Sequence, residues 1–223
     1  MEERYLRNLP ALSEAEQLLL RQKRVLIVGC GGIGGHLVDL LLRVGVGHIR
    51  VVDGDVFEPS NLNRQLLSGL PQLGQRKAQT AVLHGARVNP DVKMEACCEP
   101  MTEDNVSALI HGCDAVLDAL DNIESRRILS DACGSAGIPY IFGAIRGWVA
   151  QAAVSIPGDH LVKALYPEGT VLKDKSVLAF TPALCASLQA SLCVKLLTGR
   201  QFDTGKLYYF DLLELEFESF QLT

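Results

Sequence analysis

The sequence predicts an α/β protein with a Rossmann-like, mostly parallel sheet, helices on both faces, and antiparallel strands at the C-terminal end. Three observations support this prediction. A short apolar strand at residues 24–28 leads through a glycine-rich turn into an amphipathic helix. Strand and helix patterns then alternate to about residue 145, which is typical of parallel strands joined by right-handed crossovers. Beyond that point, alternating strands flank one long apolar helix, and this indicates antiparallel pairing.

The elements follow one another along the chain without an obvious linker. Residues 13–22 are expected to form an amphipathic helix, with Ser13 as its N-cap and Glu16 completing a capping box. After the first strand, further strands are expected at residues 48–53, 92–98, 115–120, 138–143, 148–156 and 206–215. After the helix that follows the glycine turn, further helices are expected at residues 74–88, 102–110, 123–135 and 183–197.

Composition restricts the classes of function. With 223 residues, 48% of them hydrophobic and 21% charged, the chain has the makeup of a globular protein with a substantial core. A formal charge of −5 and scattered basic residues disfavour nucleic acid as the main partner. The N-terminal residues lack an apolar signal core, and polar residues interrupt the most apolar helix. We therefore expect a cytoplasmic location and no membrane partner.

The cysteines and histidines indicate no metal cluster. The seven cysteines contain no C-x-x-C pair, and the five histidines lie far apart along the chain. The cysteines are therefore expected to be reduced thiols that serve mostly as small core residues.

A nucleotide site is indicated by the turn between the first strand and its helix. Its glycines are Gly29, Gly31, Gly32 and Gly34. Glycines let the backbone approach phosphate groups closely, and the helix N-terminus adds free N–H groups and a positive dipole end. Asp53 ends the second strand, about twenty residues further on, where a carboxylate reaches ribose hydroxyls. The spacing alone would also suit NAD.

Three groups of polar side chains follow two strands of the predicted sheet and should converge at its carboxyl edge. They are Asp53 and Asp55 after the second strand, Asn61, Asn63, Arg64, Gln65 and then Lys77 before and within the next helix, and Asp121 and Asn122 after residues 115–120. Cations neutralise phosphate oxygens, and a carboxylate holds a hard metal ion. This mixture favours a triphosphate with Mg²⁺ over a nicotinamide ring.

Six ordered motifs resemble the ThiF/MoeB/HesA family, the bacterial relatives of ubiquitin-activating enzymes. They lie at residues 4–8, 29–34, 53–55, 60–65, 74–77 and 118–122. The match continues through residues 165–168 and 187–199, so it covers nearly the whole chain. In that family, ATP adenylates the C-terminal glycine of a small ubiquitin-like sulfur carrier of the ThiS/MoaD type, and pyrophosphate leaves. The resemblance implies one adenylation domain over residues 1–223: a helical arm at 1–22, a nucleotide-binding half at 23–145 and a carrier-binding half at 146–223.

The resemblance also implies a role for each site residue. Gly32 lies against the nucleotide, Asp53 holds the ribose, Asn61 and Arg64 contact phosphates, Lys77 neutralises the α-phosphate, and Asp121 supports Mg²⁺. Arg7 would reach the active site of a neighbouring subunit, which implies an obligate homodimer. The resemblance further implies a carrier that ends in Gly-Gly and whose carboxylate attacks phosphorus directly. Positioning and charge neutralisation therefore supply the catalysis.

The chain departs from the family pattern in two respects. The family's structural zinc uses two C-x-x-C pairs, but residues 161–164 read Leu-Val-Lys-Ala and no cysteine follows Cys193. No zinc site is therefore expected. Many members also carry a cysteine in the loop that crosses the carrier tail. The corresponding residues 169–180 contain none, and Cys185, the nearest, is expected in the core because it begins an apolar helix.

Other functions remain open at this stage. A related branch activates a tRNA-bound carboxylate with ATP, as the tRNA threonylcarbamoyladenosine dehydratases do. The acidic balance and the residues 166–168 and 187–190 favour the carrier branch. An NAD(P)-dependent dehydrogenase has support only from the glycine turn and Asp53, and a non-catalytic scaffold is disfavoured by the intact charged residues. The carrier and its pathway, whether thiamine, molybdopterin, cysteine or another product, stay open, as does any covalent role of Cys185.

Overall fold

One eight-stranded mixed sheet forms the centre of the computed structural model, which describes residues 2–171 and 176–223. The strand order is β3-β2-β1-β4-β5-β6-β7-β8. The strands are parallel from β3 through β5 and antiparallel from β5 through β8, so the predicted fold class is confirmed. Their bounds are β1 Arg24–Val28, β2 His48–Val52, β3 Lys93–Cys97, β4 Ala115–Asp118, β5 Tyr140–Arg146, β6 Val149–Ser155, β7 Lys206–Asp211 and β8 Glu216–Gln221.

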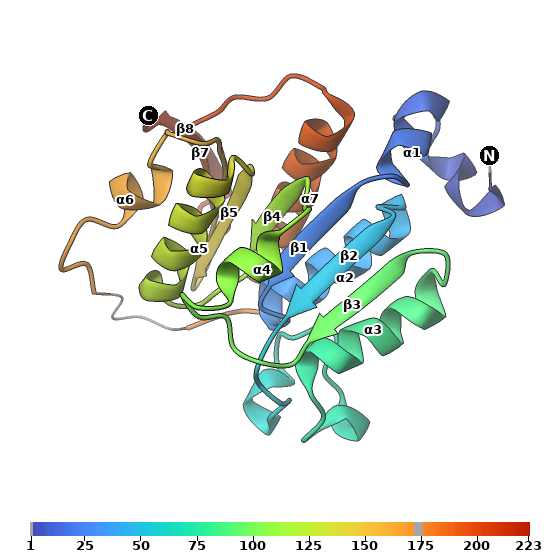
Figure 1. Ribbon diagram of the computed structural model, residues 1–223. Helices are drawn as coiled ribbons and strands as arrows, with labels where there is room; N and C mark the ends of the chain where they lie inside the picture. The colour runs from blue at the N-terminus through green and yellow to red at the C-terminus, as the bar shows by residue number, and fades with distance from the viewer. Residues whose placement is uncertain (1, 172–175) are drawn as a thin grey trace.

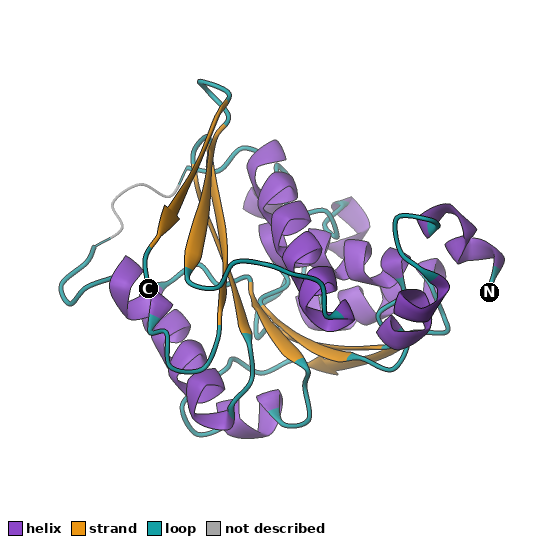
Figure 2. Cartoon of the chain, turned by 90° about the horizontal axis from the view of Figure 1, so that it is seen from above, coloured by secondary structure: helices purple, strands orange, loops and turns teal. Residues whose placement is uncertain are grey.

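Helices cover both faces of this sheet (Figures 1 and 2). The helices are α1 Glu14–Leu20, α2 Gly32–Val44, α3 Lys77–Val88, α4 Val106–Ile110, α5 Ile123–Ala136, α6 Leu161–Leu165 and α7 Phe180–Thr198. Short 3₁₀ turns lie at η1 Glu3–Asn8, η2 Pro59–Asn61 and η3 Leu70–Gln72. One core joins α2, α3 and α7 to the sheet, and a second core joins α4, α5 and α6 to its other face.

The central strand β1 contributes to both cores. Val25 and Ile27 belong to the core on the α2 side, whereas Leu26 and Val28 belong to the core on the α5 side. This alternation follows from the two-residue period of a strand. A strand covered on both faces needs apolar residues at every position, which is why residues 24–28 read as an unbroken apolar run after Arg24.

Helix α7 is long and apolar enough to cross a membrane by length and composition alone. Half of it, however, is buried inside this fold, where it packs against α2, β5 and β6. A helix enclosed on several sides is apolar nearly all round for that reason.

The N-terminal arm lies at the amino end of β1 in Figure 1, opposite the end at which that strand stops. The predicted capping box is confirmed: the Glu16 amide donates to Ser13 Oγ, and the Ser13 amide donates to the Glu16 carboxylate at 2.7 Å. Arg200, just after α7, donates to the same carboxylate at 2.8 Å and ties the arm to the body of the protein. Tyr5 of η1 is buried, and its hydroxyl accepts from Asn89 at 2.8 Å.

The C-terminal hairpin departs from the prediction. A single strand was expected over residues 206–215, but β7 ends at Asp211 and the chain reverses into β8. The Asp211 carboxylate accepts from the amides of Leu213 and Glu214, which is a local turn signal, and Leu215 adopts a positive φ of 57°. The apolar side chains of Leu213 and Leu215 continue the two-residue period through this turn. The sequence pattern alone therefore did not reveal where β7 ends.

Candidate nucleotide and acyl-adenylation site

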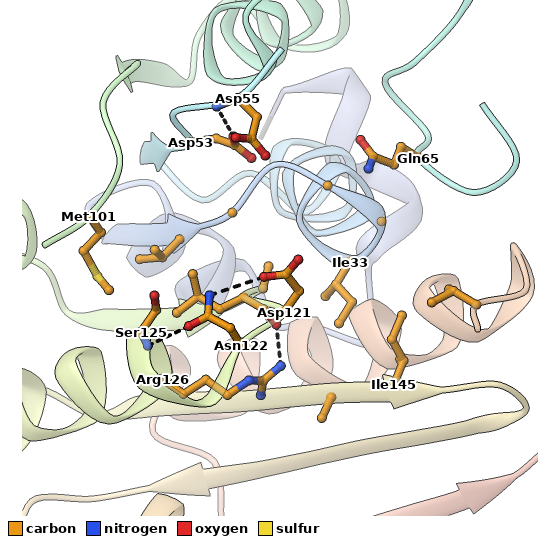
Figure 3. A pocket seen from close by; sticks show the side chains of 18 of the residues that line it. Ile33, Asp53, Asp55, Gln65, Met101, Asp121, Asn122, Ser125, Arg126 and Ile145 are labelled. Carbon is orange, nitrogen blue, oxygen red and sulfur yellow. Dashed lines mark hydrogen bonds between the residues drawn. The ribbon is translucent and has the colours of Figure 1, made fainter. Parts of the chain in front are cut away.

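A cavity of about 670 Å³ lies beyond the carboxyl ends of β1, β2 and β4 and continues along β5 and β6 (Figure 3). Open parallel sheets bind ligands at this edge, and the volume falls within the usual range for small-molecule sites. Among the residues expected at the site, those lining the cavity are Gly29, Gly31, Gly32, Asp53, Asp55, Arg64, Gln65, Lys77, Asp121 and Asn122.

The glycine turn brings α2 directly against β1. Gly29 has a φ of 97°, which favours glycine, and its amide donates to Val52 O at 2.8 Å. A Cβ on Gly34 would lie 1.8 Å from Gly29 O, so Gly34 is needed for this close packing. Gly34 does not line the cavity, unlike Gly32. Gly31, the N-cap of α2, supplies no side-chain cap, which leaves the first N–H groups of the helix available for an anion.

Asp53 is held at the edge of the cavity by two backbone amides. Its carboxylate accepts from the amide of Cys30 at 2.7 Å and from that of Asp55 at 2.8 Å. Burial raises the pKa of Asp53, while these two hydrogen bonds and the nearby Lys77 act in the opposite direction. A carboxylate fixed in this way has lone pairs left to accept hydroxyl groups of a ribose.

Two of the cations that line the cavity, Lys77 and Arg64, were expected there from the sequence; Arg126 and Arg146 line it as well. The Lys77 ammonium, whose side chain is 9% exposed, lies 3.0 Å from an oxygen of Asp55. Arg64 donates to Ser60 O at 2.9 Å and to Asn63 Oδ1 at 2.8 Å, and both bonds use Nη1. Among the described residues, the other donors of this guanidinium group have no hydrogen-bond partner and can take an anionic oxygen.

Four of the expected site residues lie outside the cavity lining. Gly34 packs the turn, as described above. Asn61 is buried and accepts from the Glu58 amide at 3.0 Å, which shapes the loop, and Asn63 donates to Val177 O at 3.3 Å. Arg7 is exposed on η1, part of the N-terminal arm that Figure 1 shows at the amino end of β1. The structure therefore leaves Arg7 apart from the cavity of its own chain.

The turn after β4 presents a carboxylate to the cavity. Asn122 is the N-cap of α5, because its Oδ1 accepts from the Ser125 amide at 2.9 Å. Its Nδ2 donates to Asp121 Oδ1 at 3.3 Å, so the Asp121 carboxylate is oriented without serving as the cap. Mg²⁺ prefers oxygen ligands and is usually held by one or two carboxylates together with phosphates. Asp121 fits this requirement, because it is exposed in a cavity that Lys77 and Arg64 also line.

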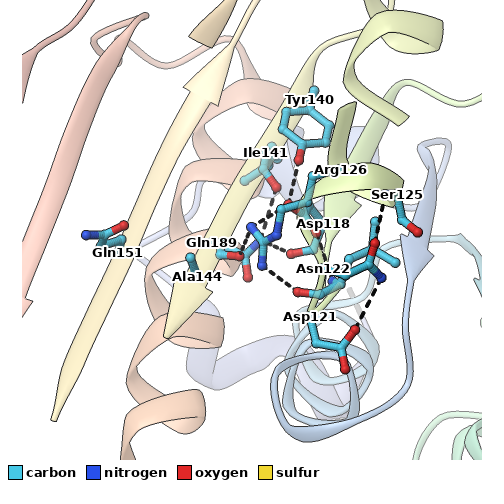
Figure 4. A network of polar contacts seen from close by, with 12 residues as sticks. Asp118, Asp121, Asn122, Ser125, Arg126, Tyr140, Ile141, Ala144, Gln151 and Gln189 are labelled. Atoms are coloured by element: carbon cyan, nitrogen blue, oxygen red, sulfur yellow. Dashed lines mark hydrogen bonds and ion pairs between the residues drawn. The ribbon is translucent and has the colours of Figure 1, made fainter. Parts of the chain in front are cut away.

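A buried polar network lies beneath this turn and was not predicted from the sequence (Figure 4). Arg126 Nη1 donates at 2.8 Å both to Asp118 Oδ2 and to Gly143 O. The Tyr140 hydroxyl donates to the same Asp118 oxygen at 2.5 Å. Burial raises the pKa of Asp118, while the Arg126 charge and the Tyr140 hydroxyl act in the opposite direction. The available signal was one aspartate within an otherwise apolar strand.

Gln189 of α7 closes the network from the other face of the sheet. Its Nε2 donates to Asp118 O at 2.8 Å and to Ile141 O at 3.0 Å. A Cβ on Gly143 would lie 2.3 Å from this amide, so the neighbouring strand makes room for it.

The far side of the cavity is formed by the antiparallel strands. Its lining there includes Ala144, Ile145, Arg146, Val149, Gln151 and Tyr209. At the turn between β5 and β6, the Trp148 ring packs on Phe180 with a centroid distance of 5.1 Å, and both rings stay partly exposed, by 42% and 46%. The cavity therefore extends past the residues expected to hold a nucleotide as far as Arg146 and Val149, which flank the turn that carries Trp148.

The structure confirms the expected core position of Cys185. It is fully buried, burial raises the pKa of its thiol to about 12, and its Sγ lies 3.3 Å from Gln151 O. Residues 161–164 begin α6, where Leu161 and Val162 are buried. The expectation for residues 169–180 falls partly on residues 172–175, which lie outside the described residues.

The fold and the cavity define the class: an α/β protein of the nucleotide-binding type with a charged site at the carboxyl edge of its sheet. The ThiF family model matches residues 3–223. The chain belongs to the ThiF family, as the resemblance implied. A SAMP-activating enzyme E1 of Haloferax volcanii is 36% identical over 208 residues, covering 90% of this chain and 77% of that protein. A sulfur carrier protein adenylyltransferase of Thermus thermophilus is 33% identical, covering 94% and 82%.

Longer relatives also match. The probable adenylyltransferase/sulfurtransferase MoeZ of Mycobacterium tuberculosis is 34% identical over 97% of this chain, and the chain spans 59% of its length. Together these relatives confirm the expected enzyme class, an adenylyltransferase. Among solved structures, E. coli MccB with MccA superimposes with a TM-score of 0.86 at 22% identity, covering all of this chain and 72% of that one. This likeness supports the fold.

Proposed function

We propose that the protein uses ATP to adenylate the C-terminal glycine carboxylate of a small ubiquitin-like sulfur-carrier protein of the ThiS/MoaD type, releasing pyrophosphate. One observation carries this proposal: Arg64, Lys77 and Asp121 face a single cavity that also holds the glycine turn and Asp53. Relatives named as SAMP-activating and sulfur-carrier-adenylylating enzymes support the choice of substrate. The cations also suit a triphosphate better than the nicotinamide of a dehydrogenase.

The chemistry follows from the charges. An oxygen of the carrier carboxylate attacks the α-phosphorus of ATP, a new O–P bond forms, and the bond to the bridging oxygen breaks as pyrophosphate leaves. Lys77 and Arg64 offset the charge that gathers on the phosphate oxygens. Mg²⁺, when bound, neutralises part of the triphosphate charge, and Asp121 is the residue that would hold it. No protein nucleophile is required, which agrees with the buried, protonated thiol of Cys185.

Three parts of the chain have different roles in this reaction. Residues 1–22 are the arm, 23–145 bind the nucleotide, and 146–223 bind the carrier, whose Gly-Gly end would enter along β5 and β6. Because Arg7 lies away from the cavity of its own chain, we assign it to the site of a second subunit in a homodimer. The proposed setting is the cytoplasm, with no membrane or nucleic-acid partner.

The test is ATP–pyrophosphate exchange with a candidate carrier that ends in Gly-Gly. Exchange should require both Mg²⁺ and the carrier, and Asp121→Ala should lower it by about 10²-fold or more, as removal of a group that stabilises charge does. Glu124→Ala is the matched control, since Glu124 is exposed on the first turn of α5 and does not line the cavity. Exchange that is unchanged in Asp121→Ala, or that responds to tRNA in place of a carrier, would refute the proposal.

The assembly has its own test. Subunits carrying Arg7→Ala and subunits carrying Arg64→Ala should each be inactive alone. When they are mixed and allowed to exchange, some dimers contain one intact composite site, so part of the activity should return. No recovery, with subunit exchange demonstrated, would remove Arg7 from the partner's site.

A further inference from the structure

The turn that carries Asp121 is held by the guanidinium group of Arg126, a residue that also lines the cavity. Arg126 Nη2 donates to Leu120 O, the carbonyl just before Asp121, while Nη1 donates to Asp118 Oδ2 at the end of β4. The same Nη1 also donates to Gly143 O of β5. One planar group therefore fixes the start of the turn, the carbonyl next to the carboxylate, and the adjacent strand (Figure 4).

The guanidinium itself has little freedom to move. It is buried, and its Cζ lies 5.1 Å from the ring centre of Phe142 and 6.0 Å from that of Tyr166. Asp118, its ionic partner, is fully buried and is also held by the Tyr140 hydroxyl and the Leu120 amide. The support beneath the turn is therefore rigid.

On the side that faces the cavity, the turn is held by fewer contacts. The Asp121 side chain is exposed, and the hydrogen bond found for it in the described part of the chain is the 3.3 Å contact from Asn122. A buried ion pair is often no more stable than well-packed apolar residues of the same volume. Fold stability alone therefore gives a weak reason for a buried Asp118–Arg126 pair, whereas orientation of the neighbouring carboxylate gives a specific one.

We propose that Arg126 is a positioning residue for the metal–phosphate group: it fixes the Leu120 carbonyl so that the Asp121 carboxylate is set for Mg²⁺ bound to ATP. The inference rests on the proposed role of Asp121. Small displacements of a catalytic group cost as much as about 10²-fold in rate, so this orientation matters to the chemistry. This orientation requires the guanidinium group of an arginine, because two of its nitrogens, in one plane, donate to all three acceptors.

The substitution Arg126→Lys tests the geometry of the guanidinium group separately from its positive charge. Arg126→Lys keeps a cation beside Asp118 but does not bridge it to Leu120 O. Arg127→Lys is the matched control, because Arg127 is the next residue on α5 and does not line the cavity. It donates instead to the carbonyls of Tyr166 and Pro167, at 2.8 and 3.0 Å.

The experiment measures equilibrium binding of ATP with Mg²⁺ and with EDTA, and it uses no carrier. In the wild type, Mg²⁺ should tighten ATP binding by about tenfold, the size of an ordinary coupling between two ligands. Arg126→Lys should lose most of this gain, as Asp121→Ala does, while binding in EDTA stays within about twofold and Arg127→Lys behaves as the wild type. In the double variant the two losses should not add, because both act on one interaction.

The inference is overturned if Mg²⁺ tightens ATP binding by Arg126→Lys as much as by the wild type, or if it does not tighten binding by the wild type. It is also overturned if the losses of Arg126→Lys and Asp121→Ala add in the double variant, or if Arg126→Lys weakens ATP binding equally with Mg²⁺ and with EDTA. Thermal melts check that each variant is folded. If Arg126→Lys does not fold, Asp118→Asn replaces it, since it keeps the shape and weakens the hold on Arg126; its Mg²⁺ gain should also fall. A wild type that binds ATP as expected but catalyses no exchange would refute carrier adenylation and leave this inference standing.

Discussion

Replacing Gly34 by alanine should destabilise the protein, although alanine favours helices over glycine. The added Cβ would lie 1.8 Å from Gly29 O and 2.7 Å from Gly29 C, and both atoms belong to the backbone. The Gly29 amide donates a hydrogen bond to Val52 O of β2. The backbone of Gly29 therefore cannot move away from the added Cβ. Overpacking costs about 1–3 kcal/mol, and contact with a fixed backbone belongs at the upper end.

The gain in helix propensity offsets about 1 kcal/mol of this cost, which leaves a net loss of about 2 kcal/mol. For a chain of this size that loss lowers the melting temperature by about 4–8 °C. Gly134→Ala is the control: Gly134 lies within α5 and a Cβ there meets nothing within 4 Å, so this variant should gain about 0.5–1 kcal/mol. Urea unfolding measures both variants. If Gly34→Ala is as stable as the wild type, the close approach of α2 to the turn is not the reason for that glycine.

Three further predictions concern other parts of the molecule. Because the Cys185 thiol has a pKa of about 12, iodoacetamide at pH 8 should leave it unmodified in the native protein, and mass spectrometry showing alkylated Cys185 would contradict this. The hydrogen bond from Arg200 lowers the pKa of Glu16 to about 2, from 4.5. Stability from a lowered carboxyl pKa is present above the unfolded value and is lost as pH falls through the folded one. Arg200→Gln should therefore lower the melting temperature at pH 7, and its difference from the wild type should shrink between pH 4.5 and 2; a constant difference would contradict this. Elemental analysis should find no stoichiometric zinc, since residues 161–164 supply no thiolate.

The parallel half of the sheet was predictable because its signals are local. A strand buried on both faces is an unbroken apolar run, and the glycine turn after residues 24–28 fixes where the helix must begin. The charged side chains that follow β2 and β4 lie at one edge because parallel strands end there together. For the same reason Asp53, Lys77 and Asp121 could be assigned to one cavity in advance.

The buried network could not be predicted in the same way, because its members come from distant parts of the sequence. Arg126 lies eight residues after Asp118, on a helix that reaches it only once α5 has packed on the sheet. Gln189 arrives from α7, 71 residues beyond Asp118. Motif spacing also does not separate residues that line a cavity from residues that shape its loop, and Asn61 is of the second kind.

The position of Trp148 has a practical consequence for spectroscopy. It is the single tryptophan of the chain, and it lies in the turn between β5 and β6, between the lining residues Arg146 and Val149, with 42% of its surface open to solvent. Indole emission depends on the polarity around the ring, so fluorescence excited beyond the absorption band of the five tyrosines reports on this turn alone. A polypeptide that covers the turn between β5 and β6 would shift the emission to shorter wavelength and protect the ring from iodide quenching, whereas a small molecule near Asp53 would leave both unchanged.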